Sequence, residues 1–277
     1  MRKSAVLIAA AVTAVTSLAI ASSASAIKAV SPEKNPEVRL DMSYSPAKKS
    51  TAKKQTGVKI AMDVTTDPGD GGPPPIAKVS EFLFASGMTF NYKSFDKCSV
   101  ASLETRQPEK CKTSKVGTGL AVVTVFNPAT RKLLSPQTTK LCAKITLFNG
   151  GGGKLFANIV TKVGDPANAA LGCIAPSIPA NSVLKGQITK ASGGEFGQKL
   201  VLPLEQPEVI PGQSIGIDRF TVDVGASTKA KVKGKKVTVP YIAAPKTCTS
   251  TGWGFGYFTS GLPGGLSRQA TGLQPCK

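Results

Sequence analysis

Apolar and polar residues alternate along much of this chain. Apolar side chains occupy every second position in two early segments: Val38, Leu40, Met42 and Tyr44, followed by Val58, Ile60, Met62 and Val64. Successive side chains of a β-strand point to opposite faces, so each segment predicts a strand with one buried face. A loop rich in proline and glycine over residues 67–75 separates this pair from the next segments.

Further short runs rich in β-branched residues extend to the end of the chain. They cover residues 76–84, 88–92, 116–126, 141–149, 155–163, 183–191, 199–204, 215–224, 229–242 and 252–258. The glycines of 150–153 predict a hairpin between two of these runs, and residues 100–104 predict a short helical turn. About a dozen strands and almost no amphipathic helix predict an all-β protein with a β-sandwich or jelly-roll-like fold.

The first 26 residues follow a different pattern. Arg2 and Lys3 are followed by an apolar run over 6–21 and by the small residues Ala24, Ser25 and Ala26. This arrangement predicts a signal peptide over residues 1–26 and a protein that is secreted, extracellular or cell-wall associated.

The mature chain has a simple predicted organisation. Residues 27–35 are expected to form a flexible leader, and residues 36–277 a single β-sandwich domain. No later stretch reaches the ~18 apolar residues of a membrane-spanning helix, so no transmembrane segment is expected after the signal peptide.

Six cysteines follow the predicted cleavage site: Cys98, Cys111, Cys142, Cys173, Cys248 and Cys276. An even number in an exported protein predicts disulfides. Pairing of nearest neighbours would close three moderate loops, but the spacing alone leaves other pairings open. The chain has no histidine and no Cys-x-x-Cys motif, so no metal site and no cofactor is expected.

The chain is strongly basic, with 35 Lys and Arg against 16 Asp and Glu and a net charge of +19. This excess favours anionic partners, such as cell-wall or surface polymers, although it also promotes solubility and protects strand edges. No basic segment interleaves with enough aromatic residues for base stacking, so no specific nucleic acid is expected as a partner.

The positive charge is densest between residues 229 and 236. Lys229, Lys231 and Lys233 alternate with Ala230 and Val232, Gly234 permits a turn, and Lys235 and Lys236 begin the return segment towards Val237 and Val239. Alternate residues of a strand share a face, so the pattern predicts a hairpin with a positive stripe. These five lysines are the candidate polyanion-binding residues, and an edge-protecting role is the simpler alternative.

No catalytic residue is predicted. Residues 212–216 match the G-x-S-x-G pattern of serine hydrolases, but a strand pattern follows Ser214 where a helix is needed, and no histidine is present. Asp218 and Asp223 are five positions apart, which places them on opposite faces of a regular strand. Glu205 and Glu208 lie among prolines in an expected surface loop, and Asp63, Asp67 and Asp70 miss the spacing of an EF-hand.

An aromatic row near the C-terminus supports two interpretations. Trp253, Phe255 and Tyr257 alternate with glycines and so share one face of a strand. If the row is exposed, Trp253 and Tyr257 are candidate carbohydrate-binding residues that stack on sugar rings. If it is buried, the row is part of the core, which the scarcity of aromatic residues in this chain favours.

Three segments resemble a recurring pattern in secreted bacterial proteins. They are residues 95–99 (FDKCS), residues 111–119 (CKTSKVGTG), and residues 245–248 (PKTC) leading to Trp253-Gly254-Phe255. The pattern has proline after the second cysteine, where this chain has Lys112. The resemblance implies a secreted, β-rich family with paired-cysteine segments, and it implies no activity and no functional residues.

These observations favour a non-enzymatic, disulfide-stapled module of the cell envelope, with a structural or binding role and a basic surface for anionic polymers. The alternative is a carbohydrate-active protein, either a lectin-like binder or a glycoside hydrolase with paired carboxylates. A carrier of apolar ligands is a third possibility, and it would require a cavity between the sheets.

Overall fold

The computed structural model describes residues 27–52, 54–133, 140–161, 173, 181–204, 213–232 and 234–277. The expected signal peptide, residues 1–26, lies outside these ranges, as do Lys233, Glu205 and Glu208. No helix within the described ranges is both long enough and apolar enough to cross a membrane.

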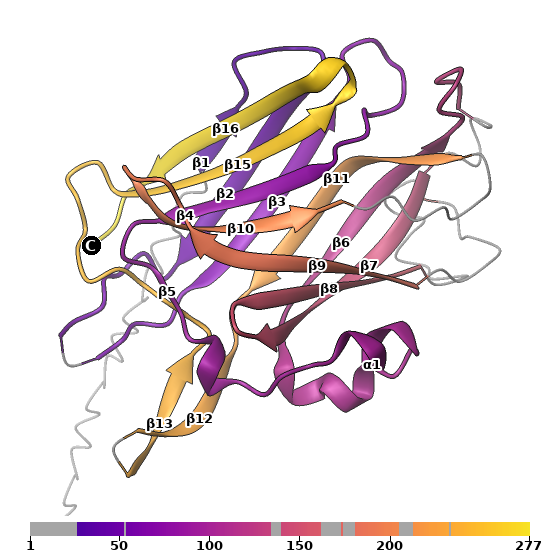
Figure 1. The fold of residues 1–277 in the computed structure, drawn as a ribbon. Helices are drawn as coiled ribbons and strands as arrows, with labels where there is room; N and C mark the ends of the chain where they lie inside the picture. The colour runs from indigo at the N-terminus through magenta and orange to yellow at the C-terminus, as the bar shows by residue number, and fades with distance from the viewer. Residues whose placement is uncertain are drawn as a thin grey trace, which may run out of the picture.

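Most of the strands in the described residues belong to one antiparallel sheet of 12 strands (Figure 1). Its first half in spatial order is β1 (Ile27–Val30), β2 (Glu37–Ser45), β3 (Lys59–Asp67), β11 (Ser214–Val224), β6 (Lys115–Phe126) and β7 (Lys140–Gly151). The second half is β8 (Lys154–Val160), β9 (Asn181–Lys190), β10 (Phe196–Pro203), β4 (Val79–Ala85), β15 (Trp253–Leu262) and β16 (Leu266–Gln274). The predicted all-β fold is confirmed.

Smaller elements lie outside this sheet. Two strand pairs do so: β12 (Ser227–Val232) with β13 (Lys235–Pro240), and β5 (Thr89–Phe90) with β14 (Ile242–Ala243). The helical elements are α1 (Val100–Glu104) and the 3₁₀ helices η1 (Tyr92–Ser94), η2 (Pro108–Ser114) and η3 (Pro263–Gly265). The helix predicted over residues 100–104 is therefore present, and Ser99 caps it by accepting a hydrogen bond from the backbone N–H of Ser102.

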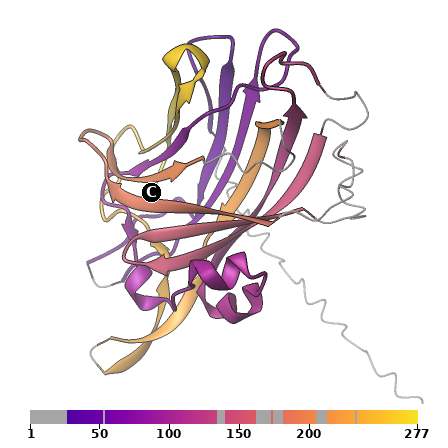
Figure 2. The same ribbon diagram turned by 45° about the vertical axis from the view of Figure 1, so that its right-hand side comes forward.

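The sheet curls until its two ends approach each other, so that it nearly closes into a barrel (Figures 1 and 2). The buried side chain of Gln274, at the end of β16, spans this seam. Its amide nitrogen donates to the carbonyl oxygen of Tyr44 at 2.9 Å, and its oxygen accepts from the backbone nitrogen of Tyr44 at 2.6 Å. Arg268 adds a 2.9 Å bond to the carbonyl oxygen of Pro36. These side chains satisfy backbone groups that lack a neighbouring strand at the seam.

The inner face of the curled sheet carries the core, and the alternation in the sequence accounts for it. In β2 and β3 the apolar positions are buried: Val38, Leu40, Met42, Tyr44, Ile60, Met62 and Val64. The predicted glycine hairpin joins β7 to β8, where Gly151, Gly152 and Gly153 adopt φ values of 74°, 61° and 79°. Residues other than glycine rarely adopt this left-handed conformation, which explains the glycine run.

Two strands differ from the sequence expectation. Residues 27–35 were expected to form a flexible leader, but β1 occupies the first four of them and pairs with β2, from Ile27 opposite Met42 to Val30 opposite Arg39. The C-terminal strand β16 was not predicted, because its buried positions include Arg268 and Gln274 and so lack an apolar alternation.

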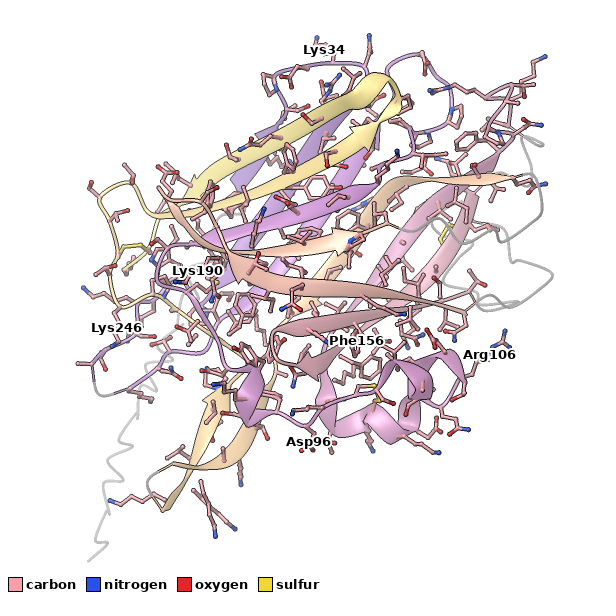
Figure 3. The ribbon with its side chains drawn as sticks, viewed as in Figure 1. Lys34, Asp96, Arg106, Phe156, Lys190 and Lys246 are labelled. Carbon is pink, nitrogen blue, oxygen red and sulfur yellow. A yellow bond between two sulfur atoms is a disulfide. The ribbon has the colours of Figure 1, made fainter. Side chains whose placement is uncertain are left out.

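The six cysteines form three disulfides between nearest neighbours: Cys98–Cys111, Cys142–Cys173 and Cys248–Cys276. The prediction of disulfides is confirmed, with the pairing that closes the shortest loops. Cys98–Cys111 brackets α1 and packs with Leu103, Phe148 and Phe156 in a separate small cluster (Figure 3). Cys248–Cys276 ties the segment before β15 to the short segment that follows β16.

Candidate functional site

The β12–β13 hairpin, which contains the candidate lysines, projects from the curled sheet (Figures 1 and 2). Lys229 lies opposite Thr238, and Lys231 lies opposite Lys236. Residues directly opposite in an antiparallel pair share a face, so Lys229, Lys231 and Lys236 lie on the same face of the hairpin. We call these three residues the lysine face.

The remaining candidate lysines lie elsewhere. Lys235 lies opposite Val232, and therefore on the other face of the hairpin together with Val237 and Val239. Lys233 is outside the described residues. The sequence pattern thus anticipated the hairpin and the shared face of Lys229 and Lys231, whereas the position of Lys236 on that face depends on the register.

The lysine face carries charge that no carboxylate in the described part of the chain neutralises. Lys229, Lys231 and Lys236 are exposed, and no ion pair in the described part of the chain joins them to a carboxylate. Lys231 and Lys236 are also direct cross-strand neighbours, an arrangement that destabilises a strand pair when the two charges are alike. An anion bound between them would relieve this repulsion.

The base of the hairpin is fixed to the rest of the molecule. The backbone nitrogen of Tyr241 donates to the carbonyl oxygen of Ala226 at 2.8 Å, and the side-chain amide of Asn91 donates to the carbonyl oxygen of Pro240 at 2.8 Å. Tyr241 itself is fully buried. The hairpin is therefore anchored at its base, and its lysine-bearing strands extend away from the core.

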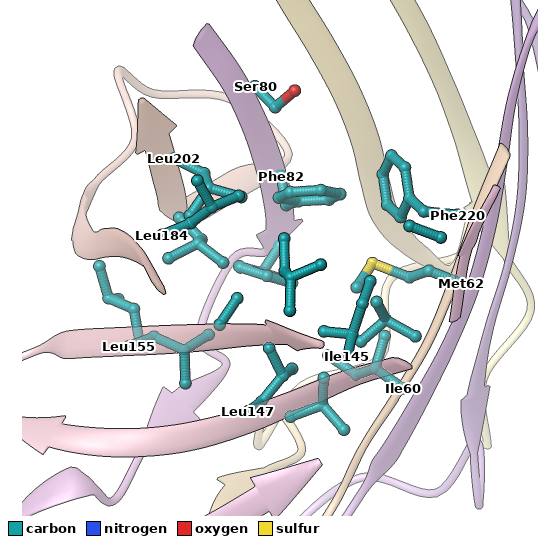
Figure 4. A pocket seen from close by; sticks show the side chains of 18 of the residues that line it. Ile60, Met62, Ser80, Phe82, Ile145, Leu147, Leu155, Leu184, Leu202 and Phe220 are labelled. Atoms are coloured by element: carbon teal, nitrogen blue, oxygen red, sulfur yellow. The ribbon is translucent and has the colours of Figure 1, made fainter. Parts of the chain in front are cut away.

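A cavity of about 90 Å³ lies inside the curled sheet (Figure 4). Side chains from strands on both sides of the fold line it, including Met62, Phe82, Leu147, Leu184 and Phe220. Almost all lining groups are aliphatic or aromatic, so the cavity is suited to an apolar molecule. The apolar-ligand carrier considered above requires such a space, but its position depends on which side chains the sheet brings to face one another and is not encoded in any local pattern.

The aromatic row belongs to the core. Trp253, Phe255 and Tyr257 have exposed fractions of only 2%, 0% and 4%. The indole nitrogen of Trp253 donates to the carbonyl oxygen of Thr247 at 3.0 Å, and the hydroxyl oxygens of Tyr257 and Ser80 lie 2.8 Å apart. Of the two interpretations, the structure therefore shows the buried one, in which Trp253 and Tyr257 offer no open ring face to a sugar.

The carboxylates of β11 differ from the expectation for a regular strand. A bulge interrupts the pairing of β11 with β6 between Ile217 and Arg219. Ile217 and Phe220 consequently both line the interior cavity, which leaves Asp218 and Asp223 on the outer face together rather than on opposite faces.

These two carboxylates do not form a hydrolytic pair. About four strand steps separate them, roughly 13 Å, whereas the paired carboxyls of glycoside hydrolases are roughly 5 to 9.5 Å apart. Asp218 accepts a 2.5 Å hydrogen bond from the hydroxyl of Thr124, and burial raises its pKa despite this bond. Asp223 is exposed.

The other polar candidates have structural partners. Arg219 pairs with Asp63, while Asp67 and Asp70 accept hydrogen bonds of 2.9 Å from the backbone nitrogens of the glycines two residues later. Among the described residues, no three cysteine, aspartate or glutamate side chains are grouped closely enough to hold a metal ion.

Ser214, the serine of the G-x-S-x-G match, begins strand β11 and does not stand at a strand-to-helix turn. The exposed lysine face and the interior cavity are both suited to binding. Comparison of the chain with family models, with curated proteins and with solved structures found no match.

Proposed function

We propose that this protein is a non-enzymatic binding module of the cell envelope, whose lysine face contacts anionic envelope polymers. The observation that carries the proposal is the exposure of Lys229, Lys231 and Lys236 on one face of a projecting hairpin, without carboxylate partners among the described residues. A polymer with regularly spaced phosphate or carboxylate groups is a suitable partner for the lysine face.

The spacing of the lysine face supports a repeating anion rather than a single one. Cross-strand neighbours such as Lys231 and Lys236 have Cβ atoms about 5 Å apart, while alternate residues of one strand are about 6.6 Å apart. Flexible lysine side chains extend this span further, so that neighbouring charges of one polymer chain can be bound together. The net charge of +19 adds long-range attraction towards the same partners.

The place of action follows from the cysteines and the predicted signal peptide. Three disulfides agree with an oxidising compartment outside the cytoplasm. Anionic polymers of the wall or outer surface are accessible to a protein in that compartment.

The test is co-sedimentation of the mature chain with isolated cell envelope at low and high salt. The variant K229Q/K231Q/K236Q removes the lysine face. The control K34Q/K190Q/K246Q removes the same amount of charge from three exposed lysines on three separate segments outside the hairpin (Figure 3). Both variants therefore have the same net charge.

The proposal predicts that the wild-type protein sediments at low salt and is released at high salt. The hairpin variant should bind about tenfold more weakly or worse, and the control should bind nearly as well as the wild type. Equal losses in the two variants, or no sedimentation of the wild type at low salt, would contradict a role for the lysine face.

A further inference from the structure

The cavity inside the curled sheet is enclosed by apolar side chains. They are Ile60, Met62, Phe82, Phe84, Phe90, Ala121, Ile145, Leu147, Leu155, Ala157, Ile159, Leu184, Ile188, Leu200, Leu202, Leu204, Ile217, Phe220, Val222, Val224 and Ile242. Among the described residues, Ser80 and Tyr241 complete the lining, and Figure 4 shows Ser80. Water needs two to four polar partners to occupy a cavity, so a lining of this kind favours an apolar occupant over water.

Small residues at particular register positions create part of the space. Ala157 in β8 lies opposite Leu147 in β7 and opposite Leu184 in β9. Ala121 in β6 lies opposite Phe220 in β11. In each case a methyl group stands where its neighbours carry a large side chain, and the missing volume opens into the cavity.

The two polar lining residues differ in their hydrogen bonding. The hydroxyl of Ser80 is paired with the hydroxyl of Tyr257 at 2.8 Å. Tyr241 is fully buried, and its hydroxyl has no hydrogen-bond partner in the described structure. Burial raises the pKa of Tyr241, so the hydroxyl stays protonated at neutral pH and can donate.

The ring of Tyr241 is held in place by its neighbours. It makes edge-to-face contacts with Phe90 and Phe95, at centroid distances of 6.0 and 5.1 Å. A buried donor without an acceptor is unfavourable, and most such groups in proteins find a partner. A donor of fixed position in a wall of hydrocarbon is the arrangement by which apolar binding sites orient a ligand.

We propose that this cavity binds a small apolar molecule, a short or branched alkyl chain, that carries one hydrogen-bond acceptor for the hydroxyl of Tyr241. The volume of about 90 Å³ sets the size of the ligand. Dry apolar cavities of roughly 150 Å³ bind benzene, so the ligand here is expected to be smaller than benzene. This proposal is independent of the lysine face.

Two probes of nearly equal shape test the proposal. Acetone carries a carbonyl acceptor, and isobutene carries a CH₂ group in its place. Binding to the mature chain is followed by the NMR shifts of side-chain methyl groups, with the Met62 methyl as a reporter inside the cavity. Titration gives a dissociation constant for each probe.

Three kinds of variant separate the contribution of the Tyr241 hydroxyl to ligand binding from that of the cavity volume. Y241F removes only the unpartnered hydroxyl. Y44F is its control, because Tyr44 is also fully buried but donates to the carbonyl oxygen of Gly254 and does not line the cavity. A157L and A121L each fill the cavity from a different strand, so that one can replace the other if it does not fold.

The wild type should bind both probes, and its ratio of acetone affinity to isobutene affinity should be about fivefold higher than the ratio for Y241F, the contribution of one hydrogen bond. Y44F should keep the wild-type ratio, and the folded A157L or A121L variant should bind neither probe. The proposal is overturned if the wild type shifts no cavity methyl with either probe, if the folded leucine variant binds as well as the wild type, or if Y241F keeps the wild-type ratio.

Discussion

At the scale of single residues, buried polar side chains have a structural role that the apolar alternation does not reveal. Gln274 is 1% exposed and satisfies both backbone groups of Tyr44 across the seam of the sheet. Arg268 is 8% exposed and bonds to the carbonyl oxygen of Pro36. In the sequence these residues resemble surface positions because they are polar. Their burial is not visible there because the hydrogen-bond partners that permit it lie more than two hundred positions away.

The substitution Q274A tests this role. It leaves the backbone N–H and carbonyl of Tyr44 without partners, and each unsatisfied buried group costs about 1 to 3 kcal/mol. We expect the free energy of unfolding in urea to fall by about 2 to 4 kcal/mol. The control Q269A changes an exposed glutamine of the same strand and should cost less than about 0.5 kcal/mol. Similar losses for both variants would argue against a closing role for Gln274.

A single bulged residue also explains why Asp218 and Asp223 were incorrectly predicted to lie on opposite faces of the strand. Counting residues in twos assumes a regular strand, whereas one extra residue in β11 reverses the faces that follow it. No residue near position 218 signals this bulge by its type. It is visible only in the pairing with β6.

At the scale of elements, local signals predicted most of the structure. The alternation in β2 and β3, the glycine hairpin between β7 and β8 and the cap at Ser99 each depend on residues close together in sequence. The lysine hairpin belongs to this group, because its strands and turn are contiguous. Strand β1 has only four residues and strand β16 buries polar side chains, so neither gave a clear pattern.

The segment that contains α1 is bracketed by a disulfide, whose contribution to stability can be tested. Cys98–Cys111 closes a loop with a sequence separation of 13 and packs against Phe148 and Phe156 beneath it. We expect C98A/C111A to lower the free energy of unfolding by about 3 kcal/mol. Hydrogen exchange should show faster exchange in α1 and unchanged protection in β15 and β16. Unchanged protection in α1 would mean that packing alone holds the segment.

At the scale of the whole molecule, the long-range pairings lie beyond the reach of the sequence pattern. Strand β11 pairs with β3 and β6, and β4 pairs with β10 and β15. These pairings decide which side chains face each other across the interior, and therefore where the cavity lies. The position of Tyr241 at the cavity wall could not be predicted for the same reason.

The net charge of +19 is also a property of the whole molecule, and it raises the question of whether binding depends on total charge or on the lysine face. Total charge attracts any polyanion at long range, whereas a contact surface releases counterions from the polymer at defined positions. These two effects differ in how steeply binding depends on salt.

The most direct test of the proposed function is therefore a salt titration of binding to inorganic polyphosphate. For a flexible anionic chain, each contact contributes roughly 0.7 to the slope of log affinity against log salt concentration. The slope for K229Q/K231Q/K236Q should be about 2 units shallower than that for the wild type, while K34Q/K190Q/K246Q should keep the wild-type slope. Equal slopes for the wild type and the hairpin variant would show that the lysine face does not contact the polymer.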